Sequence, residues 1–180
     1  RCIRDSACAA HRPALSALGA RYGVDATSIA AIWGLESFYG ERRGDVPVVS
    51  ATSTLAYDGR RGAFFESQLV AALKILQNGD TTPANMTGSW AGAMGHTQFI
   101  PTTYLAHAVD FTGDGRRDIW SDAPTDALAT TASSLAETGC ARGPRRGGAP
   151  GACPPPGPAI PPQAGGPRLS VPVPFAPTTH

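Results

Sequence analysis

The sequence predicts a mainly α-helical domain, and three observations lead to this fold class. Apolar residues recur at intervals of three and four in several segments, which is the period of a helix with one buried face. Residues that favour helix ends, namely Asp, Pro and Gly, stand where these segments begin or stop. No segment shows the alternation of apolar and polar residues that indicates a half-buried strand.

The predicted helices follow one another along the first part of the chain. The first covers about residues 11–22. The second begins at Asp25, a favoured N-cap, where Val24 and Ile29 are placed for a hydrophobic staple, and we expect it to end at Gly40. Three more helices are predicted over about residues 63–78, from Pro101 to about Val109, and over about residues 124–138.

A change in composition divides the chain near residue 140. Residues 140–180 hold 12 of the 17 prolines and seven of the 21 glycines. A segment of this kind buries too little apolar surface to offset the entropy lost on ordering. We therefore predict one folded domain over residues 1–139. Residues 140–180 are predicted to be a disordered tail rich in Pro, Gly and Arg, a linker, or a segment that is not genuine coding sequence.

Charge and hydropathy exclude two kinds of partner. Residues 1–139 carry 11 basic and 14 acidic side chains, so the domain lacks the basic surface typical of nucleic-acid binding. No apolar run is long enough to span a membrane. The chain begins at Arg1 without a signal segment, and we interpret it as a fragment or a processed product.

The four cysteines lie outside the central region of the chain. Cys2, Cys8, Cys140 and Cys153 allow up to two disulfides in an oxidising compartment, with three possible pairings. Their spacing matches no zinc site. Unpaired thiols are an alternative that the sequence supports equally well.

Glu36 is the candidate catalytic carboxylate. It follows Ile29, Ile32 and Trp33 at helical spacing, so a helix would place it on their apolar face. Burial raises the pKa of a carboxyl group, and a protonated carboxyl can donate to the leaving oxygen of a glycoside. The alternative is a Glu at the edge of this face, paired with an Arg such as Arg42 or Arg60.

The segment 88–104 combines three glycines with aromatic and amide side chains, among them Trp90, Gln98 and Phe99. Sugars are bound by such a combination, because apolar faces stack on the rings and fixed polar groups meet the hydroxyls. The alternative is a tight crossing of helices that needs small residues. His96 lies in this segment, but no Ser or Cys nucleophile motif accompanies it.

A third candidate is an acidic loop. Oxygen-bearing side chains at alternate positions, Asp110, Thr112 and Asp114, precede Gly115 at the sixth place, as at the start of an EF-hand loop. The Glu that is usual at the twelfth place is absent, so Asp126 would have to close the site. A solvated acidic turn is the alternative.

Taken together and in order, these segments resemble the membrane-bound lytic transglycosylase B family of lytic murein transglycosylases. The resemblance covers roughly residues 13–139. Five stretches carry it: IWGLESFYG at 32–40, TLAYD at 54–58 followed by Arg60 and Arg61, GSWAGAMG at 88–95, QF at 98–99, and the acidic loop at 110–120.

The resemblance implies a lysozyme-like, mainly α-helical catalytic domain with an EF-hand-like loop, in which Glu36 is the only essential carboxylate. The glycan cleft would be lined by Tyr57, Arg60, Arg61, Ser89, Gln98 and Phe99. A structural calcium ion would be held by Asp110, Thr112, Asp114, the Arg116 carbonyl and Asp126. No cofactor is implied for catalysis.

The resemblance also implies a reaction. In this family the counterpart of Glu36 protonates the glycosidic oxygen between N-acetylmuramic acid and N-acetylglucosamine in peptidoglycan. It then takes a proton from the muramic C6 hydroxyl, which closes a 1,6-anhydro ring on C1. An internal hydroxyl held beside C1 has a large proximity advantage over water, so no second carboxylate is needed. We expect a monomer that acts in the periplasm or cell envelope.

The sequence differs from the family in two places. The family's catalytic domain continues past the counterpart of Gly139 with aromatic and Asn residues of the cleft, so we expect this domain to be incomplete there. Ser37 stands where the family usually has Thr. Two other functions stay open. One is a lysozyme-type peptidoglycan hydrolase, with Asp45 or Asp58 as its second carboxylate. The other is a non-catalytic remnant that binds glycan or calcium.

Overall fold

The computed structural model describes residues 2–140, except for the side chain of Cys2, and the predicted tail over 141–180 lies outside this range. The described part is mainly α-helical, as predicted. Its helices are α1 (Cys2–Ala10), α2 (Arg12–Tyr22), α3 (Ala26–Ser37), α4 (Val48–Asp58), α5 (Gly62–Asn78), α6 (Pro101–His107) and α7 (Thr125–Glu137). The strands are β1 (Val46–Pro47) and β2 (Thr87–Gly88).

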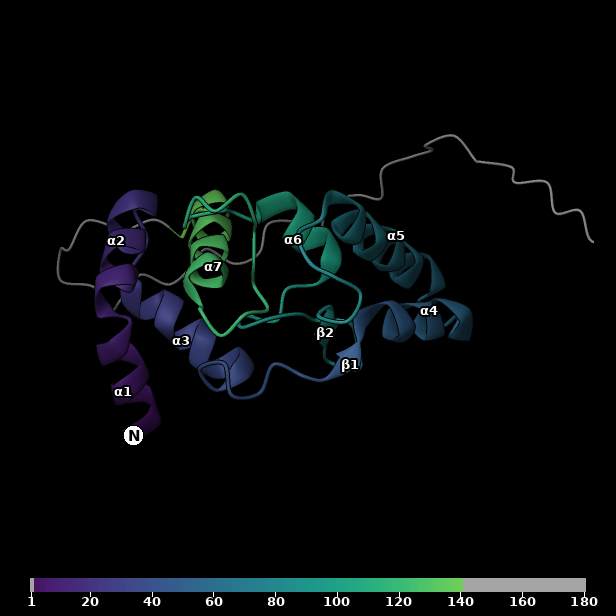
Figure 1. Cartoon of the computed structure of the whole chain (residues 1–180), viewed down its shortest axis with the longest axis horizontal. Helices are drawn as coiled ribbons and strands as arrows, with labels where there is room; N and C mark the ends of the chain where they lie inside the picture. Colours follow the sequence, from purple (N-terminus) through teal and green to yellow (C-terminus); the bar gives the residue numbers. More distant parts are fainter. Residues whose placement is uncertain (1, 141–180) are drawn as a thin grey trace, which may run out of the picture.

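The helices form two groups that meet in the middle of the molecule (Figure 1). One buried apolar cluster joins α2, α3 and α7, and includes Leu18, Ile29 and Leu128. A second cluster joins α4, α5 and α6 and includes Ile75 and Tyr104. Because α7 contributes residues to both clusters, it connects the two groups.

The helix that carries Glu36 begins as predicted and ends earlier than predicted. The Asp25 side chain accepts a hydrogen bond of 2.9 Å from the Thr27 N–H, which confirms the N-cap. The predicted stop at Gly40 is wrong, since α3 ends at Ser37. The reason is the left-handed backbone of Phe38, with φ at 54°, whose N–H bonds back to the Gly34 carbonyl.

The sequence patterns did not predict α1 or α4. In α4 the first turn contains two valines followed by Ser and Thr residues, which have low helix propensity. The helix forms because Val48, Ala51 and Thr52 are buried where α4 packs against α5. The hydroxyls of Thr52 and Ser53 also donate to carbonyls one turn earlier, so both hydroxyls find their hydrogen-bond partners within the helix.

The two strands are too short to show an alternating pattern in the sequence. β1 and β2 pair antiparallel, with Val46 opposite Gly88 and Pro47 opposite Thr87. Isolated bridges then join Gly88 to Met94 and Met94 to Phe99, so the chain after β2 folds back on itself twice. This compact turn structure is the glycine-rich segment singled out above.

Cys8 and Cys140 differ in whether they form a disulfide. Cys8 is a free thiol and Cys140 is disulfide-bonded. Two disulfides would have used all four cysteines, so that arrangement is excluded. Among the described helices, none combines the length and the apolar character that crossing a membrane requires.

Candidate active site

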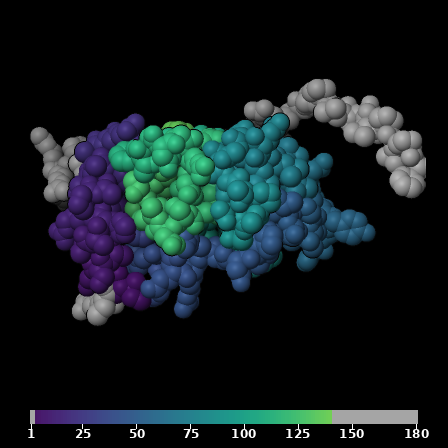
Figure 2. Space-filling model, in the orientation of Figure 1, coloured from purple at the N-terminus to yellow at the C-terminus, as the bar shows by residue number. Residues whose placement is uncertain are grey.

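Glu36 lies in the last turn of α3 with its side chain exposed to solvent. The prediction that Glu36 faces a buried apolar surface is therefore wrong. Its angular position on the helix matches that of Ile29, but the core cluster includes no residue of α3 beyond Trp33. In Figure 2 the blue atoms, which include the end of α3 and the segment that follows it, lie along the lower edge of the molecule. Among the described residues Glu36 has no hydrogen bond or ion pair.

Ser37, next to Glu36, is buried and fixes the end of the helix. Its hydroxyl donates to the His96 carbonyl and accepts a hydrogen bond of 2.9 Å from the Gly40 N–H. The bond from Gly40 closes a sharp turn, in which Phe38 and Tyr39 both adopt a left-handed backbone. The turn therefore lies between Glu36, whose carboxylate is exposed, and the loop that follows.

His96 is buried between α3 and the loop before α7. Its Nδ1 lies 3.2 Å from the Trp33 indole nitrogen, and its Nε2 lies 2.7 Å from the Ser121 carbonyl oxygen. Burial lowers the pKa of His96 below its ordinary value. A Cβ on Gly40 would come within 2.5 Å of the ring, which explains the glycine at this position. His96 thus packs as a structural residue and presents no free base to solvent.

Arg43 is a site residue that the sequence patterns missed. One of its terminal nitrogens donates to the carbonyls of Trp120 and Ser121, at 2.7 and 2.8 Å, and the other bonds to Asp122 at 2.7 Å. Its own carbonyl accepts a hydrogen bond from the Gln98 amide. Only contacts across more than 50 residues of sequence identify Arg43, so no local signal could have found it.

The glycines of segment 88–104 are required by contacts within the protein. A Cβ on Gly88 would overlap the Ala93 carbonyl, and one on Gly95 would overlap the Ile119 carbonyl. Gly95 also has a φ of 70°, which side chains disfavour. Other atoms do approach this backbone closely, as predicted, and they belong to the protein itself.

Three of the residues predicted to line the cleft lie in this same segment. The Ser89 hydroxyl accepts a hydrogen bond of 3.1 Å from the Ala93 N–H, and Phe99 pairs with Met94 through the backbone. The Gln98 amide group donates to the carbonyls of Arg43 and Gly95, which leaves its side-chain oxygen available. The bond from Ser37 to His96 joins this segment to the end of α3.

The other three predicted cleft residues lie around the turn between α4 and α5, at the end of the molecule opposite α1 (Figure 1). Tyr57 is 95% exposed, so its ring is available for stacking. Arg60 pairs with Asp58 at 2.8 Å, and Arg61 lies over the Phe64 ring at 4.3 Å. No hydrogen bond or ion pair links this group to Glu36 among the described residues.

One surface cavity lies apart from these residues. It has a volume of about 540 Å³ and lies between the loop after α5 and the loop before α7. Its walls include Asp80, Asn85 and Trp120, and none of the predicted cleft residues. This cavity is therefore not the predicted glycan cleft.

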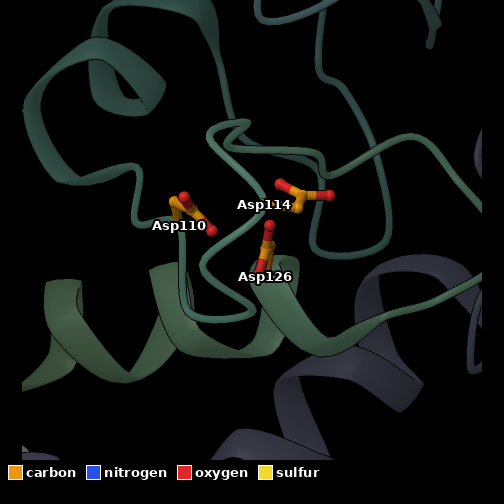
Figure 3. A group of neighbouring side chains, drawn as sticks. All are labelled: Asp110, Asp114 and Asp126. Atoms are coloured by element: carbon orange, nitrogen blue, oxygen red, sulfur yellow. The ribbon is translucent and has the colours of Figure 1, made fainter.

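The acidic loop brings three carboxylates together. Oxygens of Asp110, Asp114 and Asp126 lie within 4.8 Å of one another, and Figure 3 shows their side chains converging. Asp126 is buried and accepts hydrogen bonds from the N–H groups of Phe111, Thr112 and Asp118. Burial raises the pKa of Asp126.

The rest of the loop has the backbone that such a cluster needs. Gly115 has a φ of 86°, and its N–H donates to Asp110 at 2.8 Å. Burial acts to raise the pKa of Asp110, but hydrogen bonds from Gly115 and Gly113 outweigh it and lower the pKa overall. The Thr112 hydroxyl lies 3.4 Å from Asp110, and the Arg116 N–H donates to Asp114 at 2.9 Å. Carboxylate oxygens held this close favour a divalent cation such as calcium.

Comparison with known proteins identifies the family. A model of the transglycosylase SLT domain matches residues 5–149. The chain belongs to this family. It is 36% identical over 123 residues to membrane-bound lytic murein transglycosylase B of Escherichia coli, a match covering 68% of this chain and 34% of that protein. The predicted resemblance is thereby confirmed.

Solved structures of family members share the fold. SltB3 from Pseudomonas aeruginosa, in complex with NAG-NAM-pentapeptide, matches with a TM-score of 0.73 and 54% identity, over 76% of this chain and 37% of that one. The same protein is known in complex with NAG-anhNAM-pentapeptide. The Escherichia coli lytic transglycosylase Slt35 in complex with calcium matches with a TM-score of 0.72 and 33% identity, over 76% and 44% of the two chains.

These matches confirm the lysozyme-like, mainly α-helical fold of this transglycosylase domain. The chain spans about a third of the length of the Escherichia coli transglycosylase B and of SltB3, with shares of 34% and 37%.

Proposed function

We propose that this protein is a lytic transglycosylase that cleaves the MurNAc–GlcNAc β-1,4 bond of bacterial peptidoglycan and leaves 1,6-anhydro-MurNAc ends. The observation that carries the proposal is its 54% identity over 76% of the chain to SltB3, whose structures hold NAG-NAM-pentapeptide and NAG-anhNAM-pentapeptide. An anhydro sugar forms when an internal hydroxyl, and not water, attacks C1.

Glu36 is the proposed general acid and base. As an acid it donates its proton to the glycosidic oxygen, so that the bond from C1 to that oxygen breaks. As a base it takes the proton of the C6 hydroxyl, which regenerates the carboxylic acid. The C6 oxygen then bonds to C1 and closes the anhydro ring. An exposed carboxyl without an ion pair supports this role, because it can contact a substrate without first losing a protein partner.

A hydrolase of the lysozyme type needs a second carboxylate about 5–10 Å from the first. One of the two candidates gives it little support, because Asp58 is already paired with Arg60 at the end of α4. Asp45, in the loop before β1, is exposed like Glu36. The anhydro ligand in SltB3 also favours ring closure over hydrolysis.

We assign the glycan contacts to two groups of side chains. Ser89, Gln98 and Phe99 are half-buried residues of the segment that is hydrogen-bonded to the end of α3, and Phe99 also packs against the second core cluster. Tyr57, Arg60 and Arg61 offer an exposed ring and two guanidinium groups at the α4–α5 turn. Ring stacking and hydrogen bonds to hydroxyl and acetamide groups are the interactions that sugars require.

A structural calcium ion completes the proposal. Asp110, Thr112, Asp114, the Arg116 carbonyl and Asp126 would hold it and pin the loop between α6 and α7. The convergence of three carboxylates supports this assignment, and Slt35 is known in complex with calcium. The ion would take no part in proton transfer. The substrate sets the place of action in the periplasm or cell envelope, where a monomer would meet the glycan strands.

Glu36→Gln tests the proposed function. The amide can neither donate nor retrieve a proton, so we expect the release of anhydro ends from purified peptidoglycan to fall by about 10²–10⁴-fold. The melting temperature should change little, because the Glu36 side chain is exposed and has no hydrogen bond or ion pair within residues 2–140. Glu41→Gln, at another exposed carboxylate, is the matched control.

Three results would contradict the proposal. They are more than about a tenth of wild-type activity in Glu36→Gln, reducing ends in place of anhydro ends, and no cleavage by the wild-type protein. Reducing ends would indicate a hydrolase. Binding without cleavage would indicate a non-catalytic domain.

A further inference from the structure

We propose that Trp33 and His96 are a positioning pair that fixes the last turn of α3, and with it Glu36, as long as His96 is neutral and carries its hydrogen on Nε2. The inference rests on the proposed function, because it concerns the placement of the proposed acid. In the part of the chain that the structure describes, no hydrogen bond or ion pair holds the Glu36 side chain, so its position depends on the backbone of α3.

His96 holds that backbone at two points, one on each side of Glu36. The Trp33 indole N–H donates to the imidazole Nδ1 at 3.2 Å, and the Ser37 hydroxyl donates to the His96 carbonyl. Trp33, Ser37 and His96 are only 2%, 1% and 3% exposed, so water does not compete for these bonds. One residue of the glycine-rich segment thus fixes the turn from residue 33 to residue 37.

The hydrogen bonds determine the tautomer of His96. An indole nitrogen is only a donor, so Nδ1 must be the acceptor and carries no hydrogen. The Ser121 carbonyl is only an acceptor, so Nε2, at 2.7 Å, must carry the hydrogen. Arg43 Nη1 also lies 3.4 Å from Nε2 and would need it as an acceptor, but the Ser121 contact is much shorter. The bonds to Trp33 and Ser121 are made together by the neutral Nε2–H form alone.

Protonation of His96 would break this arrangement. The new hydrogen on Nδ1 would meet the Trp33 N–H, and the new charge would lie beside Arg43, whose Nη1 is 3.4 Å from Nε2. The ring cannot swing away, because the Gly40 backbone lies against it. Arg43, Asp122 and His11 are the charged or titratable groups that face His96, and among them Asp122 alone favours the protonated form.

The pair can be tested without measuring activity. Histidine labelled with ¹⁵N should show an Nε2–H, Nδ1-acceptor spectrum for His96 in the 180-residue chain at neutral pH. Trp33→Phe, which removes the indole N–H and keeps an aromatic ring, should shift the Nδ1 resonance. An Nδ1–H or a doubly protonated His96 at neutral pH would overturn the proposal.

Kinetics then tests whether the pair positions Glu36. We expect Trp33→Phe to lower kcat for anhydro-end release about tenfold or more, with KM within about twofold, since small misplacements of a catalytic group are costly. Trp120→Phe is the matched control, because the buried Trp120 Nε1 has no hydrogen-bond partner to lose. It should keep wild-type kcat.

The pH profile separates positioning from a general loss of stability. Burial lowers the pKa of His96, so the ring stays neutral to a lower pH than an ordinary histidine, and wild-type activity should fall only on the acid side of that ordinary value. His96→Asn keeps an acceptor for Trp33 and cannot titrate, so its profile should lose this acid-side fall. Wild-type kcat and pH profile in Trp33→Phe would overturn the positioning role. Wild-type protein without activity would contradict the proposed function, and the ring-nitrogen spectrum would still decide whether the pair forms.

Discussion

Ser37 illustrates how one buried hydroxyl can determine the shape of the backbone beside Glu36, the proposed acid. Its Oγ donates to the His96 carbonyl and accepts from the Gly40 N–H, so both sides of the turn depend on it. The turn contains left-handed residues at Phe38 and Tyr39, which cost free energy and need such support. The small side chain of Ser37 therefore acts on its neighbour Glu36 by fixing the shape of the backbone.

Ser37→Ala should destabilise the protein by about 1–3 kcal/mol, because it leaves the buried His96 carbonyl and the partly buried Gly40 N–H without this partner. Ser37→Thr keeps the hydroxyl and should cost less, although its extra methyl group must fit at a buried position. Thermal unfolding measures both variants. Ser50→Ala, at an exposed serine in α4, is the control and should stay within about 0.5 kcal/mol of wild type. Equal stability of Ser37→Ala and Ser50→Ala would contradict this account.

At the scale of elements, the loop between α6 and α7 brings like charges together. Asp110, Asp114 and Asp126 are drawn in by backbone N–H groups, so the loop keeps this shape against their mutual repulsion. A divalent cation would remove the repulsion and stabilise the folded state by linkage. The loop also leads into α7, which joins the two core clusters.

Calcium should raise the melting temperature of the chelator-treated protein, and chelation should lower it again. At a calcium concentration 100 times Kd, the expected gain is about 2.7 kcal/mol. Asp114→Asn should weaken the response, and its fold should survive because Asp114 is exposed. Glu66→Gln, an exposed site on α5, is the control. A calorimetric titration without heat of binding at millimolar calcium would remove the proposed ion.

At the scale of the whole molecule, Tyr104 connects the second core cluster to the loop before α7. Its ring is fully buried in that cluster, and its hydroxyl donates to the Arg117 carbonyl. The Arg117 side chain in turn pairs with Asp80, whose side chain is nearly buried. Burial raises the pKa of Tyr104 far above its ordinary value.

This pKa predicts a loss of stability in alkali. Tyr104 stays protonated in the folded state, whereas in the unfolded chain it ionises near pH 10. The unfolded state therefore binds fewer protons above pH 10, and the free energy of unfolding should fall as the pH rises. Denaturant melts from pH 9 to 11 should show a steeper fall for wild type than for Tyr104→Phe. Tyr57→Phe removes an exposed hydroxyl and should keep the wild-type slope.

The sequence by itself determined the helical class, the position of most helices, the Asp25 cap and the family. These features depend on residues within one or two helical turns of each other, such as the Asp25 side chain and the Thr27 N–H. Residue patterns in fixed order were enough for the family, because five matching stretches in one order are specific. The three carboxylates of the acidic loop were also close enough in sequence to be grouped.

Only the tertiary structure decided the surroundings of Glu36. Helical periodicity predicts which way a side chain points around the axis, but the place where the core ends along that axis depends on the packing of α2 and α7. Trp33 meets His96 across 63 residues, and Arg43 meets the Trp120 carbonyl across 77. Partners so distant are chosen by the whole fold, since no local interaction carries information about them. The site therefore takes its candidate acid from a local motif and its support from contacts that exist only once the chain has folded.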